Sequence, residues 1–314
     1  MTAIRKSRVR YSPIQVNLNS AALKHPLIAL SRDDVLEILI GIVGAELGRL
    51  RHSLFDSSTS DIWNAATSLT DGGVALDSIE LIQVSSAVDE FFHLHETGLE
   101  EYLLRHRALG RWCDIVLQAF LHGHRHFTFR TSGSQGAAQA NCHRASTLLE
   151  EIATLARLFR GRRRIVACVP PHHIYGFLFS ILLPQALDVP IVAMRKWPVS
   201  KILRALQPGD LVVGFPLIWQ QLDARAKRFP DDVFGVTSTA PCDPRIIESL
   251  RDRGLARMTE VYGASETGGM GYRHDPARPY RLFSHWQRLK PNRQQGKDIP
   301  LKRVGMRAII PPDR

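Results

Sequence analysis

The chain has 314 residues, of which 44% are hydrophobic, and carries a formal net charge of +11. This length is sufficient for two domains with real cores, and no apolar run approaches the roughly 18 residues of a membrane span. The first ten residues hold four basic and no acidic side chains, and residues 281–314 hold nine basic and two acidic ones, so the charge excess lies in the two ends. Tails of this kind supply only salt-dependent attraction to phosphate. We therefore expect neither a nucleic-acid nor a membrane partner.

The N-terminus lacks the apolar core of a signal peptide. The four cysteines are widely spread and form no CxxC pair: Cys113, Cys142, Cys168 and Cys242. Reduced thiols in a cytoplasmic protein are the expectation for this pattern.

Residues 1–30 lack clear periodicity and are predicted to be disordered, whereas residues 31–124 are predicted to form a small helical domain. Ser31 begins the first helix, and Asp77 begins another, where Glu80 completes a capping box. Shorter helices are expected at 98–104 and 109–120. We expect the buried side of the helix after Asp77 to consist of Ile79, Ile82, Val84, Val88, Phe91 and Phe92.

From Phe127 onwards, short β-branched runs alternate with helical stretches. This alternation predicts an α/β fold with a mostly parallel sheet and helices on both faces. The strands are expected at 165–169, 190–194, 211–215, 233–237 and 258–262, and the helices at 146–159, 175–187, 199–206, 217–228 and 244–253. After Gly271 the pattern decays, so we expect residues 281–314 to be a basic tail and the chain to be truncated there.

Ligands of such sheets bind at the carboxyl ends of the strands, and three stretches of this chain lie there. The first, TSGSQG at 131–136, has the glycines and hydroxyls that can surround a phosphate, although a flexible turn explains it equally well. The second contains His172 and His173 between a strand and an apolar helix, where a surface role is the alternative. We do not expect these two histidines to bind a metal as a pair, because adjacent side chains diverge.

The third stretch, TEVYGASETGG at 259–269, places Tyr262 at the end of a strand and Glu266 in a loop of small residues. An aromatic ring can stack on a base, and a carboxylate can hold Mg²⁺ beside phosphates. A solvated glutamate is the alternative. Phe215, Trp219 and residues 237–240 are candidates for an aryl pocket, with core packing an equal explanation.

Taken in order, the three stretches resemble the motifs of the adenylate-forming superfamily of acyl-CoA synthetases, aryl-CoA ligases and peptide-synthetase adenylation domains. The phosphate loop of that family, TSGSTGxPK, resembles Thr131–Gln139, its histidine motif resembles HIYG at 173–176, and its YGx[ST]E motif resembles Tyr262–Glu266. A narrower resemblance, through EFFHLHETGLEEYLL and HHIYGFLFSILLP, is to the compact 4-coumarate–CoA ligases that prepare the chromophore of photoactive yellow protein. Relatives that load aryl-polyene pathways are similar in the second stretch. The resemblance identifies residues 125–280 as a partial AMP-binding domain.

The resemblance implies a ligase that uses ATP and Mg²⁺ to convert a small aromatic carboxylic acid such as 4-coumarate into an acyl-adenylate. The thiol of coenzyme A, or of a carrier protein, then takes the acyl group. It implies that His173 guards the carboxylate entrance, that Tyr262 stacks on adenine with Gly263 and Ser265 beside it, and that Glu266 binds Mg²⁺. The residues implied to surround the phosphates are Thr131, Ser132, Gly133, Ser134 and Gly136.

Two features depart from the family pattern. Gln135 replaces the second threonine of the phosphate loop, and Gln139 replaces its lysine. The mobile C-terminal lid domain of the family, with its catalytic lysine, is also not recognisable. We therefore expect weak or no full-cycle activity, and the alternative function is a non-catalytic carrier or nucleotide-binding remnant of such a ligase.

The helical domain resembles acyl carrier proteins at LDSIEL, where Ser78 matches the serine that takes phosphopantetheine. Plain N-capping by Asp77 and Ser78 is the alternative. Two histidine-rich stretches, HLHE at 93–96 and the alternating His122, His124 and His126, suggest a surface metal contact. We identify no supporting carboxylate for either stretch, and the metal interpretation is not adopted.

Overall fold

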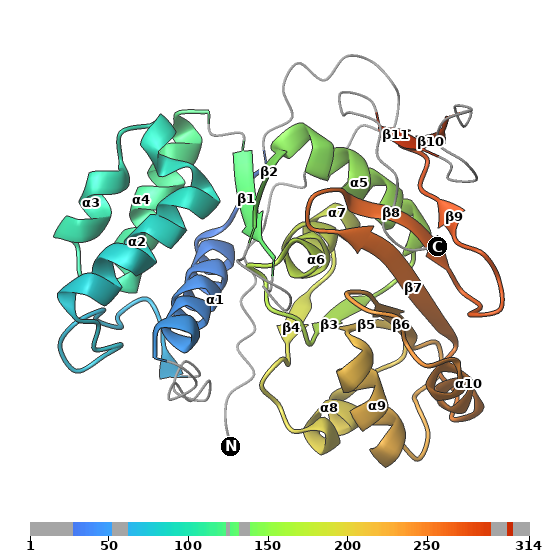
Figure 1. Cartoon of the computed structure of the whole chain (residues 1–314). Coiled ribbons are helices and arrows are strands. Elements are labelled where there is room, and N and C mark those ends of the chain that lie inside the picture. The colour runs from blue at the N-terminus through green and yellow to red at the C-terminus, as the bar shows by residue number, and fades with distance from the viewer. Residues whose placement is uncertain (1–27, 52–61, 124–125, 132–138, 290–299, 304–314) are drawn as a thin grey trace.

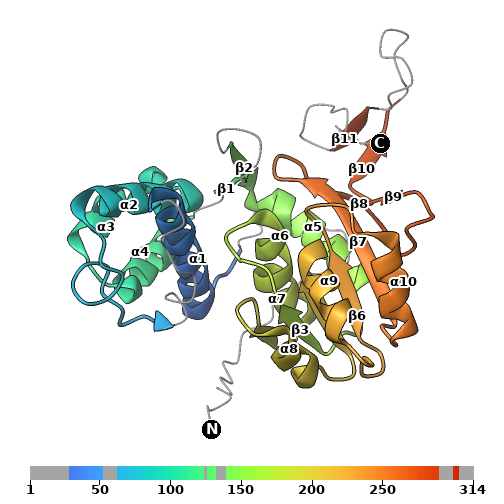
Figure 2. The same ribbon diagram turned by 60° about the horizontal axis from the view of Figure 1, so that its bottom comes forward.

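The computed structural model describes residues 28–51, 62–123, 126–131, 139–289 and 300–303. Four helices form one side of the molecule, a two-stranded hairpin follows, and a seven-stranded sheet with its helices forms the other side (Figures 1 and 2). The four helices are α1 (Arg32–Leu50), α2 (Ser78–Phe92), α3 (Glu100–Arg105) and α4 (Leu109–Leu121). None of the described helices is long and apolar enough to cross a membrane.

The starts of α1 and α2 follow the capping chemistry of the sequence. The Ser31 side chain accepts from the Asp34 backbone N–H, and the Asp34 carboxylate accepts in return from the Ser31 N–H. Asp77 and Glu80 form the same reciprocal pair at α2. These boxes satisfy backbone donors that a helix start leaves without partners, and the predicted starts of both helices are confirmed.

The predicted buried side of α2 is partly wrong. Ile79 and Ile82 are 68% and 53% exposed, because the buried stripe of α2 runs through a neighbouring face of the helix. The two isoleucines lie outside that stripe and leave an apolar patch on the surface. The buried residues are Leu81, Val84, Ser85, Ala87, Val88, Phe91 and Phe92.

The large sheet has the strand order β4-β3-β5-β6-β7-β8-β9. The first five strands are parallel neighbours, and β8 and β9 extend the sheet in antiparallel fashion. The predicted strands and the predicted α/β fold are thus confirmed. The bounds are β3 (Arg164–Ala167), β4 (Ile191–Ala193), β5 (Asp210–Gly214), β6 (Phe234–Thr237), β7 (Arg257–Ala264), β8 (Gly268–Arg273) and β9 (Arg281–Leu282).

Helices cover both faces of this sheet (Figures 1 and 2). Alternate strand residues point to opposite faces, so Leu211 and Val213 of β5 join one core and Val212 joins the other. One face packs against α5 (Ala145–Leu158) and the continuous helical stretch of α6 (Ile174–Gly176), η3 (Phe177–Leu182) and α7 (Leu183–Leu187). The other face packs against α8 (Val199–Ala205), α9 (Pro216–Arg225) and α10 (Pro244–Asp252).

One apolar core continues from the four helices into the sheet. Phe91 of α2 makes edge contacts with Phe127 and Phe177, at centroid distances of 6.1 Å for each pair. Phe127 belongs to β1 (His126–Arg130), which pairs with β2 (Ala140–Arg144). The hairpin therefore packs between the helical part and the sheet, while the division into domains at 124/125 remains a prediction.

The region after Gly271 contains more structure than we expected. Besides β9, the strands β10 (Trp286–Arg288) and β11 (Leu301–Arg303) pair with each other. Arg303 is only 1% exposed and its Nε donates to Glu150 at 3.0 Å. The positive charge at this position is thus part of the packed structure. The rest of the predicted basic tail, residues 304–314, lies outside the described residues.

Candidate functional site

The hairpin of β1 and β2 presents the predicted phosphate loop. Two hydrogen bonds close the base of the loop: the Thr131 N–H donates to the Gln139 carbonyl at 3.0 Å, and the Gln139 N–H donates to the Thr131 hydroxyl at 2.9 Å. Gln139, which replaces the family lysine, is exposed. The other predicted phosphate-binding residues and Gln135 lie outside the described residues, namely Ser132, Gly133, Ser134 and Gly136.

The histidine motif is held at the carboxyl edge of the sheet. His173 is the N-cap of α6, and the buried Tyr175 hydroxyl donates to the carbonyls of Gly214 at 2.9 Å and Val236 at 3.1 Å. A Cβ at Gly176 would lie 2.7 Å from the Pro170 carbonyl carbon and closer still to its oxygen. The tyrosine and the glycine of HIYG thus fix the turn that positions His173.

The two adjacent histidines lie together, contrary to our expectation that their side chains diverge. Their ring centroids are 4.3 Å apart. His172 packs against Gly41 of α1, where any side chain would meet its ring, and its two ring nitrogens have no hydrogen-bond partner in the described part of the chain. Burial lowers the pKa of His172 well below the usual value. Burial also lowers the pKa of His173, and a hydrogen bond with the Arg130 backbone acts in the opposite direction. Both rings are thus neutral near pH 7.

The YGASE motif lies where β7 turns into β8. A Cβ at Gly263 would lie 2.9 Å from Gly269 Cα, so the close approach of the two strands requires glycine there. The Tyr262 ring lies beside Tyr280, with centroids 5.4 Å apart. Glu266 is exposed at the turn. This exposure is compatible with Mg²⁺ binding and equally with a solvated side chain.

His143 of β2 connects the loop hairpin to this motif. Its Nε2 donates to the Ser265 carbonyl at 2.6 Å, and the ring is buried. Burial lowers the pKa of His143, with the hydrogen bond to Ser265 acting in the opposite direction. Sequence reasoning missed this residue because ANCHR, the β2 sequence, has no apolar alternation. The bond joins β2 to the 263–267 turn.

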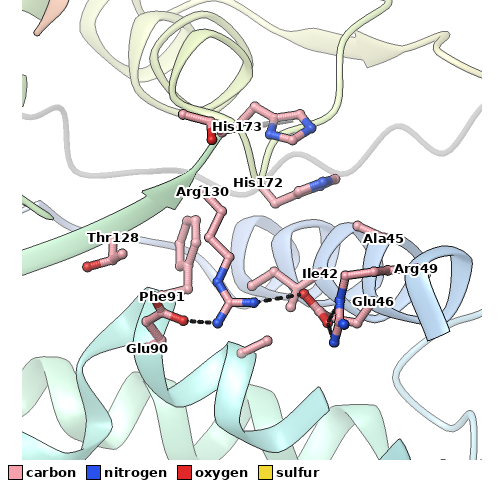
Figure 3. A pocket seen from close by; sticks show the side chains of 12 residues that line it. Ile42, Ala45, Glu46, Arg49, Glu90, Phe91, Thr128, Arg130, His172 and His173 are labelled. Atoms are coloured by element: carbon pink, nitrogen blue, oxygen red, sulfur yellow. Dashed lines mark hydrogen bonds and ion pairs between the residues drawn. The ribbon is translucent and has the colours of Figure 1, made fainter. Parts of the chain in front are cut away.

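A cavity of about 320 Å³ lies between α1, α2, β1 and the histidine motif. Figure 3 shows His172 and His173 on one side of it and α1 on the other. The cavity brings together Thr131 and His173, which the sequence predicted, whereas Tyr262, Ser265 and Glu266 do not line it. The lining residues are Ile42, Ala45, Glu46, Arg49, Ala87, Glu90, Phe91, Thr128, Arg130, Thr131, His172 and His173.

An arginine between two glutamates forms the charged floor of this cavity. Arg130 donates to Glu46 of α1 at 3.2 Å and also to Glu90 of α2, as the dashed lines in Figure 3 mark. Glu46 additionally pairs with Arg49 at 2.8 Å. Sequence reasoning did not find this network, since its members are far apart in the chain and no motif joins them.

Two other predicted positions are placed clearly. Trp219, a candidate for the aryl pocket, is fully buried and donates from Nε1 to the Val236 carbonyl at 3.2 Å, so it is a core residue. Ser78 is the first residue of α2 and is exposed beside Ile79.

Comparison with known proteins gives one family. Residues 127–299, more than half of the chain, match the sequence model of the AMP-binding enzyme family. The chain is 35% identical over 257 residues to a 4-coumarate–CoA ligase of Halorhodospira halophila, covering 82% of the chain and 65% of that protein. It is 36% identical over 267 residues to a 4-coumarate–CoA ligase of Cereibacter sphaeroides, covering 82% and 63%.

Among solved structures, O-succinylbenzoate coenzyme A synthetase from Bacillus subtilis in complex with ATP and magnesium aligns with a TM-score of 0.49 and 14% identity. That alignment covers 56% of the chain and 40% of the synthetase. The matches to the curated ligases cover 65% and 63% of those proteins, which is less than two thirds of the length of each.

Proposed function

Because the chain belongs to the AMP-binding enzyme family, we propose that it derives from an ATP-dependent acid–thiol ligase and binds ATP·Mg²⁺ and an aromatic acid of the 4-coumarate kind. In the complete reaction the carboxylate attacks the α-phosphate of ATP, pyrophosphate leaves, and a thiol of coenzyme A or a carrier protein then displaces AMP. Such chemistry depends on positioning and on neutralising charge at phosphate oxygens.

The observation that carries this proposal is the shared cavity of Thr131 and His173. Thr131 follows β1 at the base of the phosphate loop, and His173 caps the helix after β3. A carboxylate in this cavity would thus lie between Thr131, at the base of the predicted phosphate loop, and the His173 imidazole. The remaining roles follow from the family motif: Ser132, Gly133, Ser134 and Gly136 around the phosphates, Tyr262, Gly263 and Ser265 at the nucleotide, and Glu266 on Mg²⁺.

The direct test of the activity is exchange of labelled pyrophosphate into ATP in the presence of 4-coumarate. We expect weak, acid-dependent exchange that is lost in His173→Ala. Exchange at the rate of the 4-coumarate–CoA ligases that the chain matches would contradict the impairment expected from Gln135 and Gln139, and exchange that is unaffected by His173→Ala would contradict the assignment of that residue.

The position of Gln139 allows a gain-of-function test. Gln139→Lys places a cation at the closed base of the loop, where it can reach the phosphates. A charge-assisted hydrogen bond from an exposed lysine adds about 1 kcal/mol, so we expect ATP·Mg²⁺ to bind about three- to tenfold more tightly. Gln118→Lys, which adds the same charge on the exposed side of α4, serves as the control. Equal effects of the two substitutions would show that only net charge matters and would refute the loop assignment.

A second activity, attachment of phosphopantetheine to Ser78, is favoured by one observation. Ser78 lies at the exposed start of α2, and the neighbouring Ile79 and Ile82 are exposed on the same helix. We propose that a phosphopantetheinyl transferase transfers phosphopantetheine from coenzyme A to the hydroxyl of this serine, which forms a phosphodiester and releases adenosine 3′,5′-bisphosphate.

Intact-mass measurement tests this attachment. We expect the native chain and Ser86→Ala, which changes another exposed serine of α2, to gain the mass of one phosphopantetheine, and Ser78→Ala to gain none. An unchanged mass of the native chain excludes the modification.

A further inference from the structure

A cluster of imidazole and carboxylate groups lies where α2 ends. His93 adopts the left-handed conformation, with φ 50° and ψ 45°, and ends α2. The short helix η2 (Leu94–Glu96) follows directly. This tight reversal gathers His93, His95 and Glu96, from each of which one ligand atom lies within 4.8 Å of the others. The HLHE stretch thus forms a compact set of metal-binding groups.

A fourth group comes from β1, far away in the sequence. Nδ1 of His126 lies 3.4 Å from the Glu96 carboxylate, and Nδ1 of His93 lies 3.2 Å from the same carboxylate. In a tetrahedral zinc site with bonds of about 2.0–2.1 Å, neighbouring ligand atoms are about 3.3–3.4 Å apart. The two measured separations match that spacing. His126 lies outside the set whose ligand atoms are all within 4.8 Å of one another, so its ring must turn towards His93 and His95 for all four groups to bind one ion.

Hydrogen bonds fix which nitrogen each ring presents. The Asp89 carboxylate lies 2.9 Å from Nδ1 of His95 and also accepts from its backbone N–H at 2.8 Å, which leaves Nε2 of His95 for a metal. The Thr128 hydroxyl lies 2.8 Å from Nε2 of His93, which leaves Nδ1 facing Glu96. Partners of this kind orient the histidine ligands of metal sites. Asp89 is the supporting carboxylate that neither histidine motif revealed in the sequence.

We propose that His93, His95, Glu96 and His126 bind one divalent transition-metal ion of the zinc class. Three imidazole nitrogens and one carboxylate oxygen suit Zn²⁺ and provide four ligands. The ion would tie the end of α2 to the first residue of β1, the strand that carries Thr128 and Arg130 into the cavity. The site therefore joins the helical part of the chain to the strand that leads into the phosphate loop.

Cys142 lies on the other side of the His93 ring, with Sγ 3.7 Å from Nε2. Because Nε2 faces Thr128, this thiol is not part of the proposed ligand set. It is exposed and can bind soft metals by itself, so the test must separate the two sources of binding.

The test is competition for Zn²⁺ between the untagged full chain and a chromogenic chelator. We expect one ion per chain, at least tenfold weaker binding by His95→Ala/Glu96→Gln, and about 10–100-fold weaker binding by Asp89→Asn. His106→Ala, which changes an exposed histidine outside the cluster, and Cys142→Ser should bind as the native chain does. Absence of one-to-one binding, or binding that is lost only in Cys142→Ser, would overturn the proposal.

Thermal unfolding gives a second readout that does not depend on the chelator. An ion that binds only the folded state raises the melting temperature, so Zn²⁺ should raise it for the native chain and for Glu96→Asp, and not for His95→Ala/Glu96→Gln. The melting temperatures without zinc establish that each variant folds. An equal rise in the native chain and the double variant would likewise overturn the proposal.

Discussion

Single residues at the site are constrained by the backbone around them. Gly176 shows this most clearly, because its Cα faces the Pro170 carbonyl at a distance that admits no side chain. The motif HIYG is therefore a requirement of the turn as well as of the chemistry. Gly48 of α1 provides the matched comparison, since a Cβ there would meet no tertiary neighbour within 4 Å in the described part of the chain.

Replacement of Gly176 by alanine should destabilise the protein. The new methyl group displaces the Pro170 turn, and overpacking of this kind costs about 1–3 kcal/mol. Gly48→Ala should be neutral or stabilising by up to about 1 kcal/mol, because alanine favours the helix. Urea denaturation measures both changes in the free energy of unfolding. Equal values for the two variants would contradict the close approach at Gly176.

His285 gives the stability a defined pH dependence. Burial, together with the charge of Arg303, lowers its pKa from 6.5 to about 4. Between these values the unfolded chain takes up a proton that the folded chain does not, so stability that is present above pH 6.5 is lost as the pH falls towards 4.

Removing the titrating ring should therefore flatten the acid side of the stability profile. In His285→Gln, we expect the loss of unfolding free energy between pH 7 and pH 4 to be smaller by on the order of 2–3 kcal/mol. Denaturation at pH 8, where the ring is neutral in both states, isolates the change in packing. The same pH dependence in variant and native protein would show that His285 titrates normally.

At the scale of elements, the residue pattern predicted the helices and strands that depend on local periodicity. The parallel strands β3 to β7, the start of α1 at Ser31 and the capping box of α2 were confirmed, since each is encoded within a few residues. Strand β2 was missed because only His143 of its five residues is buried. The end of α2 was also beyond prediction: HLHE and His126 are separate motifs until the fold brings them together.

The corrected face of α2 leads to a stability prediction. Leu81 is 4% exposed and Ile82, the next residue, is 53% exposed. Leu81→Ala should cost about 2–5 kcal/mol through lost burial and a cavity, whereas Ile82→Ala should change the stability by about 0.5 kcal/mol or less. Chemical denaturation compares the two. A larger loss of stability in Ile82→Ala than in Leu81→Ala would show that the originally predicted buried face of α2, which includes Ile82, is correct.

At the scale of the whole molecule, the candidate site is built between parts that are distant in sequence. The order of three motifs predicted the family and the sheet edge, but not the Arg130 network with Glu46 and Glu90 or the bond from His143 to Ser265. Both depend on how the helices and the hairpin pack on the sheet, and such long-range contacts leave no local pattern. The cavity itself is lined from α1, α2, β1 and the turn after β3.

Calorimetric titration of the full chain with ATP·Mg²⁺ and with a nonhydrolysable aryl-adenylate mimic tests the central claim most directly. We expect both ligands to bind one per chain, and His173→Ala to weaken the mimic much more than ATP, since the proposed role of His173 is at the carboxylate end of the acid. Binding of neither ligand to the folded native chain would contradict the account and would favour the non-catalytic remnant.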